Sequence, residues 1–191
     1  GVAAGYLAIA DPLREDAVEA VARLREMGIR PVMATGDNEL TARAVAKAAG
    51  IEEVHAGIRP EEKLSLVRDF QALGRKVLMV GDGMNDAAAL KGADVGVAIG
   101  SGMDLAIDNA DIVIVKGGVS RIADAVSISR QTLSVIRQNL FWAFAYNFLA
   151  IPLAMAALLH PVIAESAMAF SSISVILNSM RIRAAEPGEK A

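Results

Sequence analysis

The sequence contains no cysteine among its 191 residues. Disulfides are therefore excluded, and so are thiolate metal sites built from this chain alone. Basic residues are too few for a nucleic-acid-binding protein, because 19 Lys and Arg stand against 22 Asp and Glu. A signal peptide is also missing. The chain starts with glycine, in what reads as the middle of a domain, so we expect it to be a piece of a longer protein.

Charge is absent from two long segments near the C-terminus. The whole chain is 54% hydrophobic, with a mean hydropathy of +0.41, which is too apolar for an ordinary soluble domain. Residues 139–159 carry no charge, and residues 162–180 carry only Glu165. At about 1.5 Å per residue, each segment can cross a hydrocarbon core of about 30 Å. The sequence therefore predicts a transmembrane hairpin of two helices.

Basic residues flank the two segments at their outer ends. Arg130 and Arg137 precede the first, Arg181 and Arg183 follow the second, and the connection at 160–161 has neither Lys nor Arg. By the positive-inside rule, both ends lie in the cytoplasm. We predict an integral membrane protein in contact with lipid, in the inner membrane of a bacterial cell.

The preceding part of the chain alternates short β-branched runs with amphipathic segments. The predicted strands are Arg30–Ala34, Val54–Ile58, Val77–Val80, Val95–Ile99 and Asp111–Val115, and the predicted helices are Ala17–Met27, Glu39–Ala49 and Pro60–Leu73. Strands separated by single helices predict a parallel, doubly wound, Rossmann-like α/β sheet. Such sheets bind ligands beyond the carboxyl ends of their strands.

A polar turn, GDGMND, follows the strand that ends at Val80. Its two glycines permit a tight turn and the close approach of a ligand. Asp82, Asn85 and Asp86 supply oxygen atoms of the kind that Mg²⁺ prefers. The simpler alternative is that these residues only cap the next helix, and this turn alone leaves the two explanations equally open.

Two further segments favour a phosphate site. ATGDN follows an earlier strand and offers the Thr35 hydroxyl and the Gly36 N–H to a phosphoryl group, with Asp37 at the start of the next helix. RPEEK places Lys63 one turn into another helix, where an ammonium group can neutralise phosphate charge; a solvated surface lysine is the alternative. Three such segments in order on one α/β sheet favour phosphate binding over three unrelated features.

The segments TGDN, PEEK and GDGMNDAAAL resemble the phosphorylation domain of P-type ATPases, which has a haloacid dehalogenase-like fold. The resemblance covers essentially the whole chain. It implies that Thr35 and Gly36 hold the transferred phosphoryl group, that Lys63 contacts it, and that ATP and Mg²⁺ are required. The candidate catalytic residues are Thr35, Gly36, Asp37, Lys63, Asn85 and Asp86, and the candidate Mg²⁺-binding residues are Asp82 and Asp86.

Two features depart from the pattern of that family. Ala88 stands where proline is usual, which should relax the loop slightly without affecting a ligand. More important, the chain lacks the motif DKTGT, whose aspartate accepts the phosphoryl group from ATP. In the family, the strand of that motif lies between the strands that end here at Ala34 and Val80. We expect an N-terminal portion of the pump to supply it, together with the nucleotide-binding and actuator domains.

Polar residues inside the apolar segments point to a transported ion. Tyr146 and Asn147 lie at a depth similar to that of Ser172, and Met168 shares a helix face with Ser172. Taken singly, each is explained more simply by packing, by an interfacial tyrosine or by a serine-assisted helix contact. However, YNFLAIP and MAFSS resemble the last two membrane helices of copper(I)-transporting P-type ATPases, and a thioether suits Cu(I). The resemblance implies half of a Cu(I) site, with the expected cysteines outside this chain.

We therefore predict the C-terminal part of an ATP-driven Cu(I) exporter that works through an aspartyl-phosphate. Its predicted regions are part of the phosphorylation domain at 1–120, a linker helix at 121–138, two transmembrane helices within 139–180 and a cytoplasmic tail at 181–191. Two alternatives stay open. One is a zinc, cadmium or cobalt pump of the same family, and the other is a non-catalytic membrane module, which the missing acceptor aspartate favours.

Overall fold

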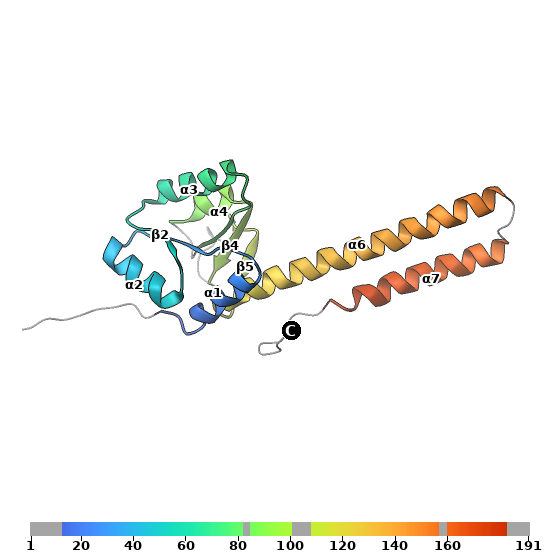
Figure 1. Cartoon of the computed structure of the whole chain (residues 1–191), viewed down its shortest axis with the longest axis horizontal. Helices are drawn as coiled ribbons and strands as arrows, with labels where there is room; N and C mark the ends of the chain where they lie inside the picture. Colours follow the sequence, from blue (N-terminus) through green and yellow to red (C-terminus); the bar gives the residue numbers. More distant parts are fainter. Residues whose placement is uncertain (1–12, 82–84, 101–107, 157–159, 183–191) are drawn as a thin grey trace, which may run out of the picture. The chain divides into compact units, whose positions relative to one another are not determined.

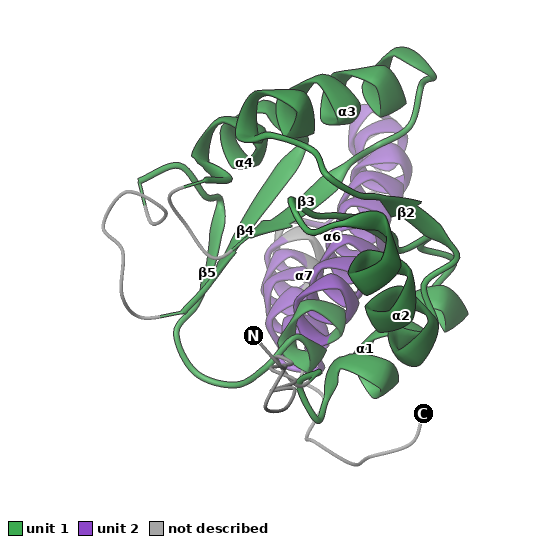
Figure 2. Ribbon diagram, turned by 90° about the vertical axis from the view of Figure 1, so that its left-hand side faces the viewer, with its two compact units in different colours: residues 1–123 green, residues 124–191 purple. Residues whose placement is uncertain are grey.

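The computed structural model describes residues 13–81, 85–100, 108–156 and 160–182 (Figure 1). The chain divides into two compact units, Gly1–Ala123 and Asp124–Ala191 (Figure 2). The first unit is an α/β domain, and the second is a pair of helices. The boundaries predicted for the linker and the tail are not tested by this division and remain predictions.

Helices and strands alternate through the first unit. In chain order they are α1 (Ala17–Glu26), β1 (Val32–Ala34), α2 (Glu39–Ala49), β2 (Glu53–His55), α3 (Pro60–Ala72), β3 (Leu78–Gly81), α4 (Ala87–Gly92), β4 (Val95–Ile99) and β5 (Ile112–Ile114). Each predicted strand and helix is present, with ends shifted by at most a few residues. The helix ends have local causes: the Asn38 side chain accepts a hydrogen bond from the backbone N–H of Thr41, and Gly50 ends α2 in a left-handed conformation.

The strands are parallel throughout, as predicted, but they form two sheets. β1 pairs with β2, with Val32 opposite Glu53, and β4 lies between β3 and β5, with Val97 opposite both Val80 and Ile112. Among the described strands, none pairs with the second edge of β1 or of β3. The break therefore falls at the position where the family resemblance places the missing strand.

Helices cover both faces of the three-stranded sheet, which makes it doubly wound. On one face, Val97 packs in a core with Ile114 and with Ile122, from the first turn of the helix that follows β5, and Leu24 of α1 packs against this core. On the other face, α4 comes so close that a Cβ added at Gly96 would lie 2.6 Å from the carbonyl oxygen of Leu90. Any side chain at position 96 would therefore force α4 away from the sheet.

A carboxylate ties the end of α3 to the sheet. Asp94, just before β4, accepts hydrogen bonds from Lys76 Nζ at 2.7 Å, from the Val77 N–H at 3.0 Å and from Gln71 Nε2 at 3.1 Å. These donors, the ammonium of Lys76 first among them, lower the pKa of Asp94 from 3.8 to about 2. The cluster thus fixes α3, which carries Lys63 at its other end.

The second unit is a helical hairpin. It contains most of α6 (Ser120–Met155) and all of α7 (Pro161–Ser179), which run antiparallel (Figure 1). The C-terminal end of α7 contacts the middle of α6, where Asn139 Nδ2 donates to Ser179 Oγ at 3.1 Å and Asn178 Nδ2 donates to Asn139 Oδ1 at 2.8 Å. α6 is continuous, so the segment predicted as a linker and the first predicted span belong to one helix.

The prediction that both helices cross a membrane is not supported. Within the described residues, neither α6 nor α7 combines the length and the apolar character that a bilayer crossing requires. The polar residues Asn139, Asn147, Glu165 and Asn178 interrupt the apolar runs of the two segments. Residues 157–159, at the end of the first predicted span, lie outside the described residues.

Replacing Asp94 by Asn should destabilise the α/β unit at neutral pH and flatten its pH dependence. Because folding lowers the pKa of Asp94 to about 2, its contribution is complete above the ordinary value of 3.8 and is lost as the pH falls toward 2. Hydrogen exchange of the β3 and β4 amides, measured across this range, should show a smaller acid-dependent loss of protection in the variant. Asp69→Asn, on an exposed part of α3, is the control and should follow the wild-type profile.

Candidate functional site

The turn after β1 and the loop after β2 are joined by backbone hydrogen bonds. The N–H of Thr35 donates to the carbonyl of His55 at 3.0 Å, which extends the β1–β2 pairing. The N–H of Ile58 donates to the carbonyl of Thr35 at 3.1 Å, and the N–H of Gly57 donates to that of Asp37 at 2.7 Å. The two segments therefore form one framework at the carboxyl ends of these strands, where an α/β sheet binds its ligands.

Within this framework the Thr35 hydroxyl has a fixed position. It donates to Asp37 Oδ2 at 3.1 Å and accepts from the Asp37 N–H at 3.1 Å. The neighbouring Gly36 is exposed, and a Cβ there would come within 3.6 Å of the carbonyl oxygen of Ile58. Capping of α2 falls to Asn38. Thr35, Gly36 and Asp37 thus form a separate polar turn beside the helix start.

Lys63 is held by the geometry of the first turn of α3. Pro60 opens the helix, and the N–H of Arg59 donates to Glu62 Oε2 at 2.7 Å, which stabilises that turn. One turn in, Lys63 Nζ donates to Asp86 Oδ1 at 2.7 Å, and the two side chains are 14% and 10% exposed. The alternative of a solvated surface lysine is therefore wrong.

Asp86 lies directly before α4 but does not cap it with its side chain. Its carboxylate pairs with Lys63 instead and packs over the end of β3, where a Cβ at Gly81 would lie 2.7 Å from Asp86 Oδ2. Glycine at position 81 is therefore required by a side chain of the site itself. The capping explanation fails for Asp86. Asn85 is exposed, and Asp82 lies outside the described residues.

The site combines a buried cation with oxygen donors at the carboxyl ends of parallel strands. A buried ammonium beside a carboxylate is suited to receive an anionic group that approaches the open edge. The Asp86 carboxylate is also a hard donor of the kind that Mg²⁺ prefers. Among the described residues, no three His, Asp or Glu side chains come together as a metal centre. The prediction that Asp82 and Asp86 bind Mg²⁺ thus remains a prediction.

The four residues predicted to bind the transported ion have different surroundings. Tyr146 lines a groove of about 510 Å³ between α6 and α7, together with Ser171 and residues of both helices. Asn147 Nδ2 donates to the Ala143 carbonyl of its own helix at 2.9 Å, and Ser172 Oγ donates likewise to the Met168 carbonyl at 3.1 Å. Asn147, Met168 and Ser172 are all exposed. Their convergence on one metal ion therefore remains a prediction.

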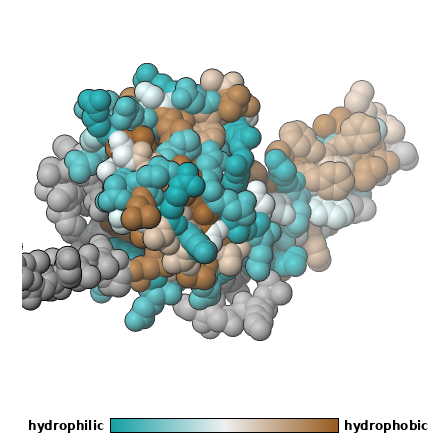
Figure 3. Space-filling model, turned by 60° about the vertical axis from the view of Figure 1, so that its left-hand side comes forward, coloured by the Kyte–Doolittle hydropathy of each residue, from teal (hydrophilic) through white to brown (hydrophobic). Residues whose placement is uncertain are grey.

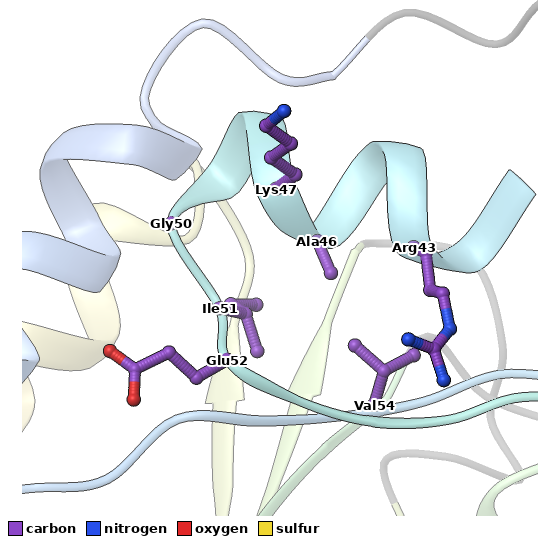
Figure 4. A pocket seen from close by; sticks show the side chains of 7 residues that line it. All are labelled: Arg43, Ala46, Lys47, Gly50, Ile51, Glu52 and Val54. Atoms are coloured by element: carbon purple, nitrogen blue, oxygen red, sulfur yellow. The ribbon is translucent and has the colours of Figure 1, made fainter.

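One hollow had no counterpart in the sequence prediction. It measures about 440 Å³ and lies beside the end of α2 and the start of β2 (Figure 4). Arg43 points from α2 toward Val54, while Lys47 projects away from it (Figure 4). Two charged residues that line this hollow already form ion pairs, Arg43 with Glu39 and Glu52 with Arg25. It lies at the amino end of β2, opposite the edge that carries the phosphate-type site.

Comparison with known families supports the assignment of the fold. Residues 2–94 match a family of haloacid dehalogenase-like hydrolases, and residues 64–125 match a second family with the same description. The first match lies within the α/β unit, the second extends two residues beyond it, and both include the segment that carries Asp86.

Curated relatives are similar along almost the whole chain. A copper-exporting P-type ATPase of Bacillus subtilis is 50% identical over 183 residues, which are 96% of this chain and 23% of that protein. A probable copper-exporting P-type ATPase V of Mycobacterium tuberculosis is 51% identical, with 96% and 24% covered. The chain thus spans about a quarter of the length of these relatives.

Solved structures agree with the arrangement of the elements. A zinc-transporting PIB-type ATPase in an E2.Pi state superposes with a TM-score of 0.83 at 32% identity, over 90% of this chain and 28% of that one. The catalytic domain of a CPx-ATPase superposes with a TM-score of 0.57 at 33% identity, over 61% of this chain and 46% of the domain.

Replacing Lys63 by Met should destabilise the carboxyl edge of β3. The methionine keeps the apolar stem but leaves the Asp86 carboxylate buried without its cation, which costs about 3 to 5 kcal/mol. Hydrogen exchange of the β3 amides should therefore accelerate. Lys91→Met, on the exposed last turn of α4, is the matched control and should leave exchange unchanged. Equal protection in the two variants would contradict a stabilising role for the ion pair.

Proposed function

Because the chain belongs to the P-type ATPases, we propose that it supplies the phosphoryl-binding edge and part of the ion pathway of an ATP-driven Cu(I) exporter. The observation that carries the catalytic part of this proposal is the 2.7 Å ion pair between Lys63 and Asp86. This pair joins two of the three segments that resemble the phosphorylation domain, and the Thr35 turn follows the carboxyl end of β1.

In the proposed reaction, the phosphoryl group moves from ATP to an aspartate outside this sequence and then to water. The Thr35 hydroxyl and the Gly36 N–H would hold the group, and the Lys63 ammonium would neutralise its negative charge. Asp86 would keep that ammonium at the edge of the sheet. Asp82 and Asp86 would hold Mg²⁺, which would supply positive charge for the phosphoryl transfer. Asn85 and Asp37 would help to orient the two loops of the site, which follow β3 and β1.

The proposal places the acceptor aspartate on a strand that enters between β1 and β3. Both strands have an edge without a partner among the described strands, and their carboxyl ends carry Thr35 and Asp86. A parallel strand in this position would end beside both residues. This geometry supports a complete site that forms only with the rest of the pump, and it speaks against a non-catalytic module.

Copper is favoured over zinc by the curated relatives and by residue chemistry. The copper-exporting relatives are 50% and 51% identical, whereas the zinc-transporting structure is 32% identical. Met168 offers a thioether, a soft ligand that suits Cu(I) better than Zn²⁺. We propose that Tyr146, Asn147, Met168 and Ser172 contribute to the ion pathway, with further ligands from the rest of the pump.

We also propose that the helical unit operates in a hydrophobic environment formed by lipid and by other helices of the pump. Figure 3 shows polar side chains over much of the α/β unit and hydrophobic side chains gathered on the helical unit. Large apolar side chains are exposed along both helices, among them Phe148 at 81% and Phe170 at 77%. Surface of this kind on two helices is typical of a membrane or protein contact. The protein would thus act at the membrane with both ends in the cytoplasm.

In the complete pump, replacing Asp82 by Asn should slow phosphoenzyme formation about a hundredfold, because it removes a charge that stabilises the transition state. Asp124→Asn, in α6, should change the rate little. Radiolabel from ATP, trapped in acid, is the measurement. The 191-residue chain by itself should incorporate none, since it lacks the acceptor motif. Equal labelling of the two variants would overturn the role given to Asp82.

Replacing Met168 by Leu in the complete pump should lower its Cu(I) stoichiometry while preserving its stability. Leucine keeps the volume and apolar character of methionine but removes the thioether. Met155→Leu is a matched control, because both methionines are largely exposed on helices of the same unit. Stoichiometry is measured under reducing conditions with a competing chelator. If both variants bind as much Cu(I) as the wild type, Met168 is not a ligand.

A further inference from the structure

A shallow groove on α6 combines two arginines with two large aromatic side chains. It measures about 510 Å³ and is lined by Arg130, Leu133, Ser134, Arg137, Gln138, Phe141 and Trp142. All of these residues lie in the described part of α6. The groove therefore carries positive charge at one end and apolar, aromatic surface at the other.

The spacing of these residues places them in one line along the helix. Arg130, Ser134, Arg137 and Phe141 follow one another at intervals of four, three and four residues, which is the repeat of a single helix face. At the rise of an α-helix, the two arginines are about 10 Å apart along the axis. Both guanidinium groups and the Ser134 hydroxyl can thus face one phosphate and its neighbouring polar groups.

The apolar end of the groove continues into the exposed apolar surface of α6. Phe141 is 65% exposed and Trp142 is 64% exposed, and they are followed by Phe144, Phe148 and Leu149, which are also exposed. Trp is favoured where a hydrocarbon layer meets a polar one, because its ring has an apolar body and an N–H donor. Arginine just outside such a layer attracts acidic headgroups.

We propose that this groove binds the headgroup of an anionic phospholipid, with the phosphate at Arg130, Ser134 and Arg137 and the first part of an acyl chain along Phe141 and Trp142. The inference rests on the proposed membrane location of the helical unit. Two properties of the groove favour a lipid over a soluble anion: its positive charge and its continuity with the apolar surface of α6. The arginines give positive charge to one end of the groove only. The other end opens onto apolar surface, which an acyl chain would cover and a free phosphate would not.

The single tryptophan of the chain provides a local probe of this site. The complete 191-residue chain is reconstituted in phosphatidylcholine bilayers that contain a small, equal fraction of either brominated phosphatidylglycerol or brominated phosphatidylcholine. Bromine on the acyl chain quenches tryptophan fluorescence on contact. Quenching of Trp142 should be stronger with the brominated anionic lipid, and high salt should reduce the difference because screening weakens the attraction.

Substitution of the arginines tests the assignment. Each arginine near an anionic surface contributes about a fivefold preference, so Arg130→Gln with Arg137→Gln should remove most of the selectivity for the anionic lipid. Arg68→Gln with Lys47→Gln, which removes two charges from the α/β unit, is the matched control and should retain it. Far-UV circular dichroism and the unquenched spectrum of Trp142 establish that each variant is folded.

Three results would overturn the proposal. They are equal quenching by the two brominated lipids, undiminished selectivity in the double arginine variant, and loss of selectivity when inorganic phosphate replaces chloride at constant ionic strength, which would identify a soluble anion as the ligand. None of these results bears on phosphoenzyme formation or on Cu(I) stoichiometry in the complete pump. The lipid site can therefore fail while the proposed function stands.

Discussion

The ion pair between Lys63 and Asp86 is the contact on which the candidate site depends. It links the start of α3 to the turn after β3, two segments separated by 23 residues. An ammonium and a carboxylate that are both largely buried are stable only together, because either alone would have to give up its hydration without compensation. Several other features serve this contact. Gly81 leaves space for the carboxylate, Glu62 stabilises the turn that carries the lysine, and Asp94 fixes the far end of α3.

Local sequence signals were sufficient to locate the helices and strands. Alternation of β-branched runs with amphipathic segments located every strand of the described sheets, because these short strands are bounded by glycine or polar residues on both sides. The sequence could not decide between a cap and a ligand. Asn38 and Asp86 both stand immediately before a helix, yet the first caps it and the second pairs with a lysine from a distant segment. That difference arises from tertiary contacts.

The helical hairpin shows how much an apolar composition predicts. The two apolar segments correctly predicted the helices α6 and α7, but a membrane crossing also requires an apolar run of sufficient length, and asparagines and serines interrupt both segments. Spacing along the helices was likewise insufficient to show whether four side chains converge on one ion. These are Tyr146, Asn147, Met168 and Ser172. Their side chains follow the local backbone: two of them donate to carbonyls of their own helix.

The break between β1 and β3 has a consequence for the behaviour of the chain in solution. Each of these strands presents an edge of backbone N–H and C=O groups that no described strand satisfies. Edges of this kind pair readily with extended segments of other molecules, which is a common origin of aggregation. The unpaired edges of β1 and β3 would admit the strand that carries the acceptor aspartate, but they can also pair with strands of other molecules. Self-association of the chain therefore competes with binding of that strand until the strand is in place.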